Sequence, residues 1–167
     1  KTVPSGKLTD TWARSYDDYP SSRTFSYRDD NLDDEYYSDG IYVGYRYFDT
    51  FGIMPLYCFG YGKGYTDFSL VTKEVTADEK LVKVEVEVTN IGKVYPGREV
   101  VQVYYSAPDG VMEKPTQELA GFAKTKLLMP GEKEVVTVTF ATDMMQHGSW
   151  RKASIRFVWG TVHVQRK

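Results

Sequence analysis

The segment at residues 81–89, LVKVEVEVT, alternates strictly between apolar and polar side chains. Because successive side chains of a β-strand point to opposite faces, this pattern predicts a strand with one face in a core and the other toward solvent. Strands of this one-sided kind are typical of antiparallel sheets. The side chains expected in the core are Val82, Val84, Val86 and Val88.

Further short apolar stretches follow at regular intervals, and Pro, Gly and Asn turns separate them. We expect strands near residues 99–106, 117–128, 136–140, 155–159 and 161–165, the last two as a hairpin around Gly160. Six or seven such strands predict an all-β antiparallel sandwich of immunoglobulin or fibronectin type III topology, with an irregular N-terminal arm. A disulfide-bearing immunoglobulin domain is excluded because the chain has one cysteine. Val162 and Val164 are expected to face inward, and the apolar residues that mark the other strands are Val101, Val103, Tyr105, Leu119, Phe122, Leu127, Val136, Val138 and Phe140.

Residues 40–66, which we name the joint, are rich in aromatic residues and glycine and carry few charges. Residues 40–49 are expected to form a strand that is buried on both faces, because side chains of both parities are apolar. Gly60, Gly62 and Gly64 are expected to let the backbone lie close to a neighbouring surface. Cys58 stands among apolar residues, which indicates a buried and unreactive thiol. So much ring surface predicts that the joint packs between two bodies.

Residues 1–39 form a polar and acidic arm with one short expected strand at residues 8–12. Its run DDNLDDE at 29–35 places Asp29, Asn31 and Asp33 at the first ligand positions of a calcium-binding EF-hand loop. Asp34 then stands where that loop needs glycine, and Gly40 stands where it needs a bidentate glutamate. These mismatches favour a solvated acidic loop.

The sequence contains no pattern that predicts catalysis or a cofactor by this chain alone. His147 and His163 are the only histidines, and two histidines so far apart make a weak metal site. A net charge of −2 argues against nucleic-acid binding. No apolar run approaches the ~20 residues that span a bilayer. The first residues have no apolar core of a signal peptide, and the chain starts with Lys1, which indicates a piece of a longer protein.

Six motifs stand in a fixed order along the chain. They are GIYVGYRYFD at 40–49, PLYCFGYG at 55–62, VTNIG at 88–92, GREVVQVY at 97–104, KPTQELAGFAK at 114–124 and LMPGE at 128–132. Together they resemble the C-terminal region of glycoside hydrolase family 3 β-glucosidases. The resemblance covers roughly residues 4–142 and weakens after Asp143, where we expect either divergence or a shifted reading frame.

The resemblance implies three parts: residues 1–39 as the end of an α/β sandwich domain with an acidic loop, residues 40–66 as the joint, and residues 67–167 as a fibronectin type III-like domain. It also implies a parent enzyme that is a retaining glycosidase with two carboxylates ~5 Å apart. The family's nucleophile and acid/base belong to the preceding domains, so no catalytic residue is carried over. The partners implied are those catalytic domains and a β-glucoside or oligosaccharide at the parent's site.

The first hypothesis for function is therefore a structural and interface module of a β-glucosidase. A carbohydrate-binding module with exposed Tyr or Trp platforms and a free-standing interaction domain are the alternatives, and association of several copies stays open. Packing of the joint's rings against protein would favour the first, and a coplanar row of exposed rings the second. Arg46 and Asp49 are expected to form an ion pair within the joint. The residues expected at this interface are Tyr42, Tyr45, Arg46, Tyr47, Phe48, Asp49 and Phe59.

Overall fold

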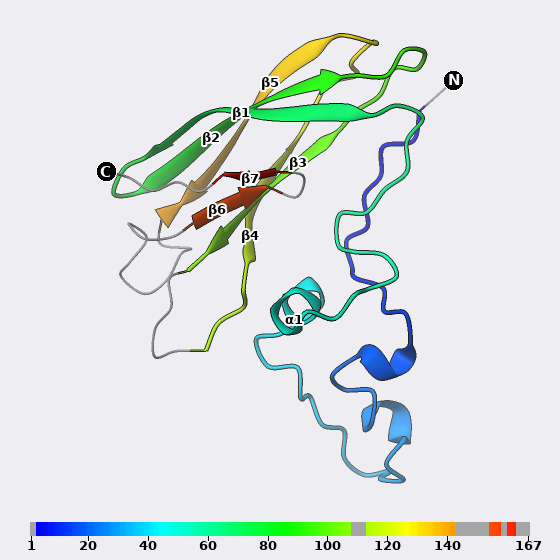
Figure 1. Ribbon diagram of the computed structural model, residues 1–167. Helices are drawn as coiled ribbons and strands as arrows, with labels where there is room; N and C mark the ends of the chain where they lie inside the picture. Colours follow the sequence, from blue (N-terminus) through cyan, green and yellow to red (C-terminus); the bar gives the residue numbers. More distant parts are fainter. Residues whose placement is uncertain (1–2, 108–112, 143–153, 158–159, 163–167) are drawn as a thin grey trace. The chain divides into compact units, whose positions relative to one another are not determined.

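The computed structural model describes residues 3–107, 113–142, 154–157 and 160–162 (Figure 1). The chain divides into two compact units, which we describe separately. The first, which we name the sandwich unit, comprises the described parts of Lys1–Lys7, Gly62–Val111 and Glu118–Lys167. The second, the joint unit, comprises Leu8–Tyr61 and the described part of Met112–Gln117.

One sheet of the sandwich unit has three antiparallel strands in the order β1-β2-β5, namely β1 (Phe68–Ala77), β2 (Leu81–Asn90) and β5 (Lys133–Ala141) (Figure 1). The alternating segment forms β2, the central strand. Its four inward valines are each at most 1% exposed, which confirms the predicted core face. The sequence did not single out β1, an edge strand whose register shifts between Thr72 and Glu74.

The second sheet has the order β4-β3-β6-β7 and is also antiparallel. Its strands are β3 (Val100–Ser106), β4 (Glu118–Lys124), β6 (Ser154–Phe157) and β7 (Gly160–Val162). The expected closing hairpin is present, because Phe157 pairs with Gly160. The inward placement expected for Val162 and Val164 lies outside what the structure describes.

The core of the sandwich lies between valines of both sheets, with Leu128 and Phe140 among them. Of the apolar residues that marked the strand expected at residues 117–128, Phe122 and Leu127 are exposed. In β4 the register against β3 shifts between Leu119 and Gly121, so Ala120 is an extra, bulged residue. A bulge reverses which side chains face inward, and beyond it Gly121 and Ala123 face the core while Phe122 faces solvent. Leu127 is exposed because the next residue, Leu128, takes the inward position.

The joint unit contains little regular structure. Its elements are the short helix α1 (Tyr45–Phe51) and the 3-10 turns η1 (Tyr16–Asp18) and η2 (Phe25–Tyr27). Residues 8–12, expected as a strand, pair irregularly with residues 56–61 through an isolated antiparallel bridge between Trp12 and Tyr57 and through bonds of Leu8 with Gly60 and Tyr61. Within the described residues, no helix is long and apolar enough to cross a membrane.

The side chain of Asn90 ties together the loops at one end of the sandwich. Asn90 is fully buried at the end of β2. Its Nδ2 donates to the carbonyl oxygens of Tyr95 (3.0 Å) and Leu128 (2.9 Å). Its Oδ1 accepts from the Gly92 N–H (3.0 Å) and the Thr66 hydroxyl (2.5 Å). A buried amide with all of its hydrogen bonds made fixes three segments, Thr66, the loop between β2 and β3, and Leu128, against each other.

Asn90→Ala should lower the free energy of unfolding of the sandwich unit by about 3 kcal/mol, because it removes the Asn90 bonds to the Tyr95 carbonyl, the Gly92 N–H and the Thr66 hydroxyl, and one of the two bonds to the Leu128 carbonyl. Urea unfolding followed by far-UV circular dichroism measures this change. Asn31→Ala, at a partly exposed position in the joint unit, is the control of matched residue type and should change stability by less than about 1 kcal/mol. Equal midpoints for the two variants would contradict the role given to Asn90.

Gly97→Ala should also destabilise the sandwich unit, because a Cβ atom at Gly97 would lie 2.6 Å from Thr66 Cγ2 and 2.8 Å from Phe68 Cζ. Overpacking of this kind costs about 1–3 kcal/mol. Gly6→Ala is the control, since a Cβ atom there meets no atom within 4 Å. Adding Thr66→Ser removes Cγ2 and keeps the hydroxyl, so the double variant should recover part of the loss. If the stability losses of Gly97→Ala and Thr66→Ser simply add in the double variant, the methyl group of Thr66 is not the obstacle.

Candidate functional site

The helix α1 lies in the middle of the joint, where the sequence predicted a strand that is buried on both faces. That prediction, made for residues 40–49, was wrong, because residues 40–44 form no strand and Tyr45–Phe51 form the helix. Gly44 before the helix and Gly52 after it both have positive φ, at 58° and 66°, and Gly52 closes the helix in the left-handed conformation. Glycine adopts these angles without strain, which makes the pair the sequence signal for a short helix. Seven residues span too few turns for a 3.6-residue period to be visible.

Most of the expected interface residues lie on or beside this helix. Phe48 is its buried residue, at 1% exposure, and its ring meets Tyr19 edge to face with centroids 5.7 Å apart. Tyr47 and Phe51 are four residues apart on the helix, and their ring centroids lie 5.0 Å apart. With Tyr47 against Phe48 and Tyr42 against Phe51, these rings form one cluster, to which Tyr19 and Phe51, neither expected from the sequence, also contribute. Tyr45 and Phe59 make a further ring pair.

The ring geometry of this cluster is that of a packed interior. Tyr47 and Phe48 stand at an interplanar angle of 89°, and the further pair of Tyr45 and Phe59 at 40°. A platform that stacks on sugar rings would present coplanar faces to solvent, and the described ring pairs of the joint do not have this arrangement.

Around the cluster the joint unit exposes large apolar side chains. Four of the six come from the segments that flank α1, Phe51 ends the helix, and Trp12 lies on the segment that bridges to Tyr57; only three charged residues occur in residues 40–66. Such a concentration of exposed apolar surface is typical of a contact face. We name it the joint face, and its residues are Trp12, Ile41, Val43, Phe51, Met54 and Leu56, each between 45% and 70% exposed.

Residues 113–117, between β3 and β4 in sequence, hold the C-terminal half of α1. The Thr116 N–H donates to Thr50 Oγ1 (3.0 Å), and Gln117 Nε2 donates to Asp49 Oδ2 (2.8 Å). Burial raises the pKa of the Asp49 carboxyl above 3.8, and the hydrogen bond from Gln117 opposes this rise. Sequence reasoning did not foresee this contact, because it joins residues more than sixty positions apart. The ion pair expected between Arg46 and Asp49 stays a prediction.

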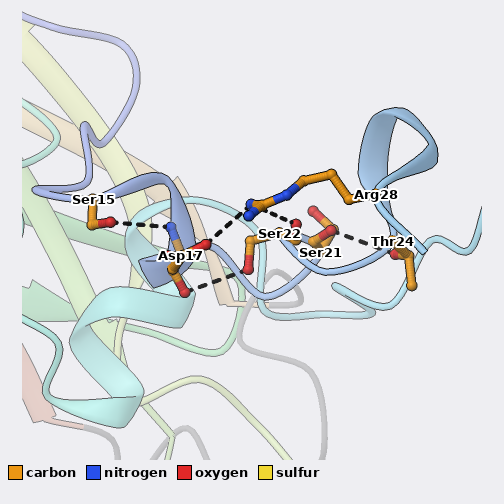
Figure 2. A network of polar contacts seen from close by, with 6 residues as sticks. All are labelled: Ser15, Asp17, Ser21, Ser22, Thr24 and Arg28. Carbon is orange, nitrogen blue, oxygen red and sulfur yellow. Dashed lines mark hydrogen bonds and ion pairs between the residues drawn. The ribbon is translucent and has the colours of Figure 1, made fainter. Parts of the chain in front are cut away.

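The acidic arm is a folded loop that is organised by Arg28 (Figure 2). Its guanidinium donates to Asp17 Oδ1 (3.0 Å) and to the Ser22 carbonyl (3.1 Å), and it lies 5.0 Å from the Tyr16 ring centroid. Hydroxyls of Ser22 and Thr24 bond to nearby carbonyls in the same network. No group of three His, Cys, Asp or Glu side chains that could hold a metal occurs among the described residues. His147 and His163 lie outside the described residues.

Two local expectations for the joint have different outcomes. Cys58 is exposed, so the buried thiol was wrong. It directly follows Tyr57, which pairs with Trp12 through an isolated bridge. The close approach of glycine backbone is confirmed at Gly62, where a Cβ atom would overlap with the Gly6 carbonyl oxygen. Gly60 takes a positive φ of 80° in a turn.

Comparison with known proteins agrees with this architecture. Residues 99–165 match the family described as fibronectin type III-like domain. The chain is 43% identical to β-glucosidase A of Butyrivibrio fibrisolvens, in a match covering 98% of the chain and 22% of that protein. It is 38% identical to thermostable β-glucosidase B of Acetivibrio thermocellus, over 93% of the chain and 21% of that protein. The chain thus spans about a fifth of the length of these relatives.

Crystal structures of related proteins share the fold. A β-glucosidase from Paenibacillus barengoltzii superimposes with a TM-score of 0.84 at 37% identity, over 97% of the chain and 19% of that structure. β-Glucosidase 3B from Thermotoga neapolitana, in complex with α-D-glucose, gives a TM-score of 0.82 at 40% identity, over 93% of the chain and 22% of that structure. By sequence and by fold, the chain therefore belongs to the glycoside hydrolase family 3 proteins, as the C-terminal region that carries their fibronectin type III-like domain.

Proposed function

We propose that this chain is the non-catalytic, structural end of a glycoside hydrolase that removes terminal β-glucosyl residues. The observation that carries the proposal is the extent of the match to β-glucosidases. It covers 98% of the chain in one relative, so it includes the joint unit as well as the sandwich. A sandwich acquired alone as a binding or adhesion module would not carry the joint with it.

In this proposal the joint face is one half of an interface with the catalytic domains of the same enzyme. Val43 and Met54, 60% and 70% exposed in this chain, then become buried against those domains. The ring cluster behind them is a rigid support, because Phe48 is already buried inside the joint unit. The described parts of residues 1–39, the joint and residues 67–167 are proposed to be the end of the preceding domain, the connection and the fibronectin type III-like domain.

The chemistry of the parent enzyme then comes from residues in the remaining four-fifths of its length. A retaining glycosidase needs two carboxyl groups about 5 Å apart, one as nucleophile and one as acid and base. In the joint, Asp49 has the amide of Gln117 as its hydrogen-bond partner and serves to hold α1. The chain packs against the catalytic domains and buries their shared interface, and bond cleavage is carried out by residues of those other domains.

A carbohydrate-binding module is the second candidate function, because some rings of the joint unit are exposed. Tyr37 is 89% exposed and Trp12 is 53% exposed. Against this candidate, Trp12 meets Tyr57 edge to face at 68°, so the two rings do not form one flat platform. Titration with sugar distinguishes the two functions.

Two measurements on the full chain test the proposal. Incubated with an aryl β-glucoside, the chain should release aglycone no faster than buffer does. When it is titrated with cello-oligosaccharides in a calorimeter, it should give no saturable heat. Turnover above buffer would contradict the non-catalytic role, and saturable binding that Trp12→Ala abolishes would favour the carbohydrate-binding module.

A chimera tests the interface itself. In β-glucosidase A of Butyrivibrio fibrisolvens, this chain replaces the region that it matches. The chimera should keep its glucosidase activity, and Val43→Asp with Met54→Asp should lower its thermal stability or activity because two charges become buried. The same pair in the isolated chain should be nearly neutral, as should Val71→Asp, a control at an exposed position of β1. Equal tolerance in chimera and isolated chain would show that the joint face is not an interface.

The structural role of Asp49 makes stability depend on pH. Because its folded-state pKa is raised, its contribution to stability is complete below the unfolded pKa of 3.8 and is lost as pH rises through the folded value. An asparagine at this position would keep an acceptor for Gln117 without a charge, so Asp49→Asn should gain stability relative to the natural chain as pH rises from 4 toward neutrality. Thermal unfolding followed by fluorescence measures this difference.

Gln117→Leu is the second arm of the Asp49 experiment. It removes the hydrogen bond that lowers the pKa of Asp49, so the loss of stability with rising pH should extend to higher pH and be larger. A difference between Asp49→Asn and the natural chain that stays constant with pH would refute the assignment.

A further inference from the structure

The loops at the Asn90 end of the sandwich expose a second group of apolar side chains. They belong to the connection that leads into β1, the loop between β2 and β3, and the loop before β5. A contiguous group of large exposed apolar side chains is typical of an interaction surface. We name the group the sandwich patch, and it comprises Tyr65, Ile91, Val94, Tyr95 and Met129, each between 51% and 70% exposed.

The sandwich patch is held in place before any partner binds. The rings of Tyr65 and Tyr95 lie with centroids 5.8 Å apart. Asn90 bonds to the Tyr95 carbonyl on one loop and to the Leu128 carbonyl, next to Met129, on another. The backbone of Gly97 pairs with Leu128 and closes the two loops against each other. A preformed surface loses little conformational entropy on binding.

Basic side chains border the patch. Lys63, Lys93 and Arg98 are exposed and adjoin patch residues or the Gly97 bridge in sequence. None of the three forms an ion pair with another described residue, whereas the neighbouring carboxylates of Glu99 and Glu132 are engaged by Lys7 (2.7 Å) and Lys126 (2.8 Å). Asp67 is the exposed acid nearest in sequence. The border therefore carries unneutralised positive charge and suits an acidic partner with an apolar centre.

The joint unit presents a surface of that composition. In the loop at residues 25–37, Leu32 is 75% exposed between Asp29, Asp30, Asp33 and Asp34, and all four carboxylate residues are exposed. Phe25, Tyr27, Tyr36 and Tyr37 add exposed rings. The Arg28 network in Figure 2 shapes the N-terminal part of this loop.

The formal charges of the two units also differ in sign. The sequence ranges of the joint unit hold eleven acidic and five basic side chains, a formal charge of −6. Those of the sandwich unit hold twelve acidic and sixteen basic side chains, a formal charge of +4. The two units are thus opposite in sign although the chain as a whole carries only −2.

We propose that the sandwich patch of one chain binds the acidic loop, residues 25–37, of a second copy. The occupant is a second copy because the matching apolar centre and the opposite charge both occur on this chain. The contact satisfies two-fold symmetry if each copy contributes its patch to the loop of the other. It does not rest on the proposed glycosidase function, since it uses neither the joint face nor any catalytic group.

The first test is the mass of the full chain in solution, measured by sedimentation or by light scattering after gel filtration. The screening length of salt falls from about 10 Å at 0.1 M to about 3 Å at 1 M. The dimer dissociation constant should therefore rise at least about tenfold between these conditions. A chain that stays monomeric at low salt and high protein concentration overturns the proposal, and so does a dimer that salt does not weaken.

Charge reversal locates the contact. Lys93→Glu with Arg98→Glu should raise the dissociation constant at least about tenfold, as should Asp33→Lys with Asp34→Lys on the acidic loop. The matched control is Lys73→Glu with Lys80→Glu, which changes the net charge equally. Lys80 precedes β2 at its far end, about 30 Å from Asn90 along a strand of ten residues. If the control pair raises the dissociation constant equally, the sandwich patch is not the contact surface.

Mixing the two reversed variants provides the decisive arm. Each variant alone opposes like charges at the contact, but a mixed pair joins the natural patch to the natural loop and the reversed patch to the reversed loop. An equimolar mixture should recover a dissociation constant within about threefold of the natural chain, since both contacts again join opposite charges. Failure of the mixture to associate, with both variants folded by circular dichroism, overturns the proposal, because contact within one chain or with another partner cannot be restored by mixing.

Discussion

The sandwich depends on a polar side chain at an apolar position. Asn90 is the next inward-facing residue of β2 after Val82, Val84, Val86 and Val88, and it is as buried as they are. A buried amide is costly unless its donors and acceptor are satisfied, and here all four bonds are made, to Thr66, to the loop after β2 and to Leu128. The requirement explains why Gly92 and Gly97 lie against Thr66, since the loops must come close enough to reach the amide.

Local patterns predict the sandwich well wherever alternation is unbroken. In β2 and β5 every inward residue that the sequence indicated is buried. The pattern fails at Ala120, where one extra residue in β4 reverses the faces and puts Phe122 in solvent. It fails again in β1, whose edge position and register shift leave a mixed burial pattern with no clear period. Both failures are bulges, and a bulge depends on the partner strand, so one strand's sequence does not determine it.

The joint was harder to predict because its structure depends on contacts that are distant in sequence. Aromatic and β-branched residues favour a strand at residues 40–49, yet packing of Phe48 on Tyr19 and the bonds from Thr116 and Gln117 stabilise a helix. Tertiary contacts often override weak propensity in segments this short. Gly44 and Gly52 were the local signal, and their meaning becomes clear only once both angles are known to be positive. The residues of the candidate interface could be named, but not their conformation.

The two exposed apolar surfaces of the chain differ in the kind of contact that they suit. The joint face has few charges, which is the composition of a permanent interface that resembles a domain core cut in half. The sandwich patch is bordered by the exposed basic side chains of Lys63, Lys93 and Arg98. Charged borders speed association and choose partners more than they add affinity, so this surface suits a reversible contact. A chain with both surfaces can be fixed within one polypeptide at its joint and still associate with another copy through its sandwich.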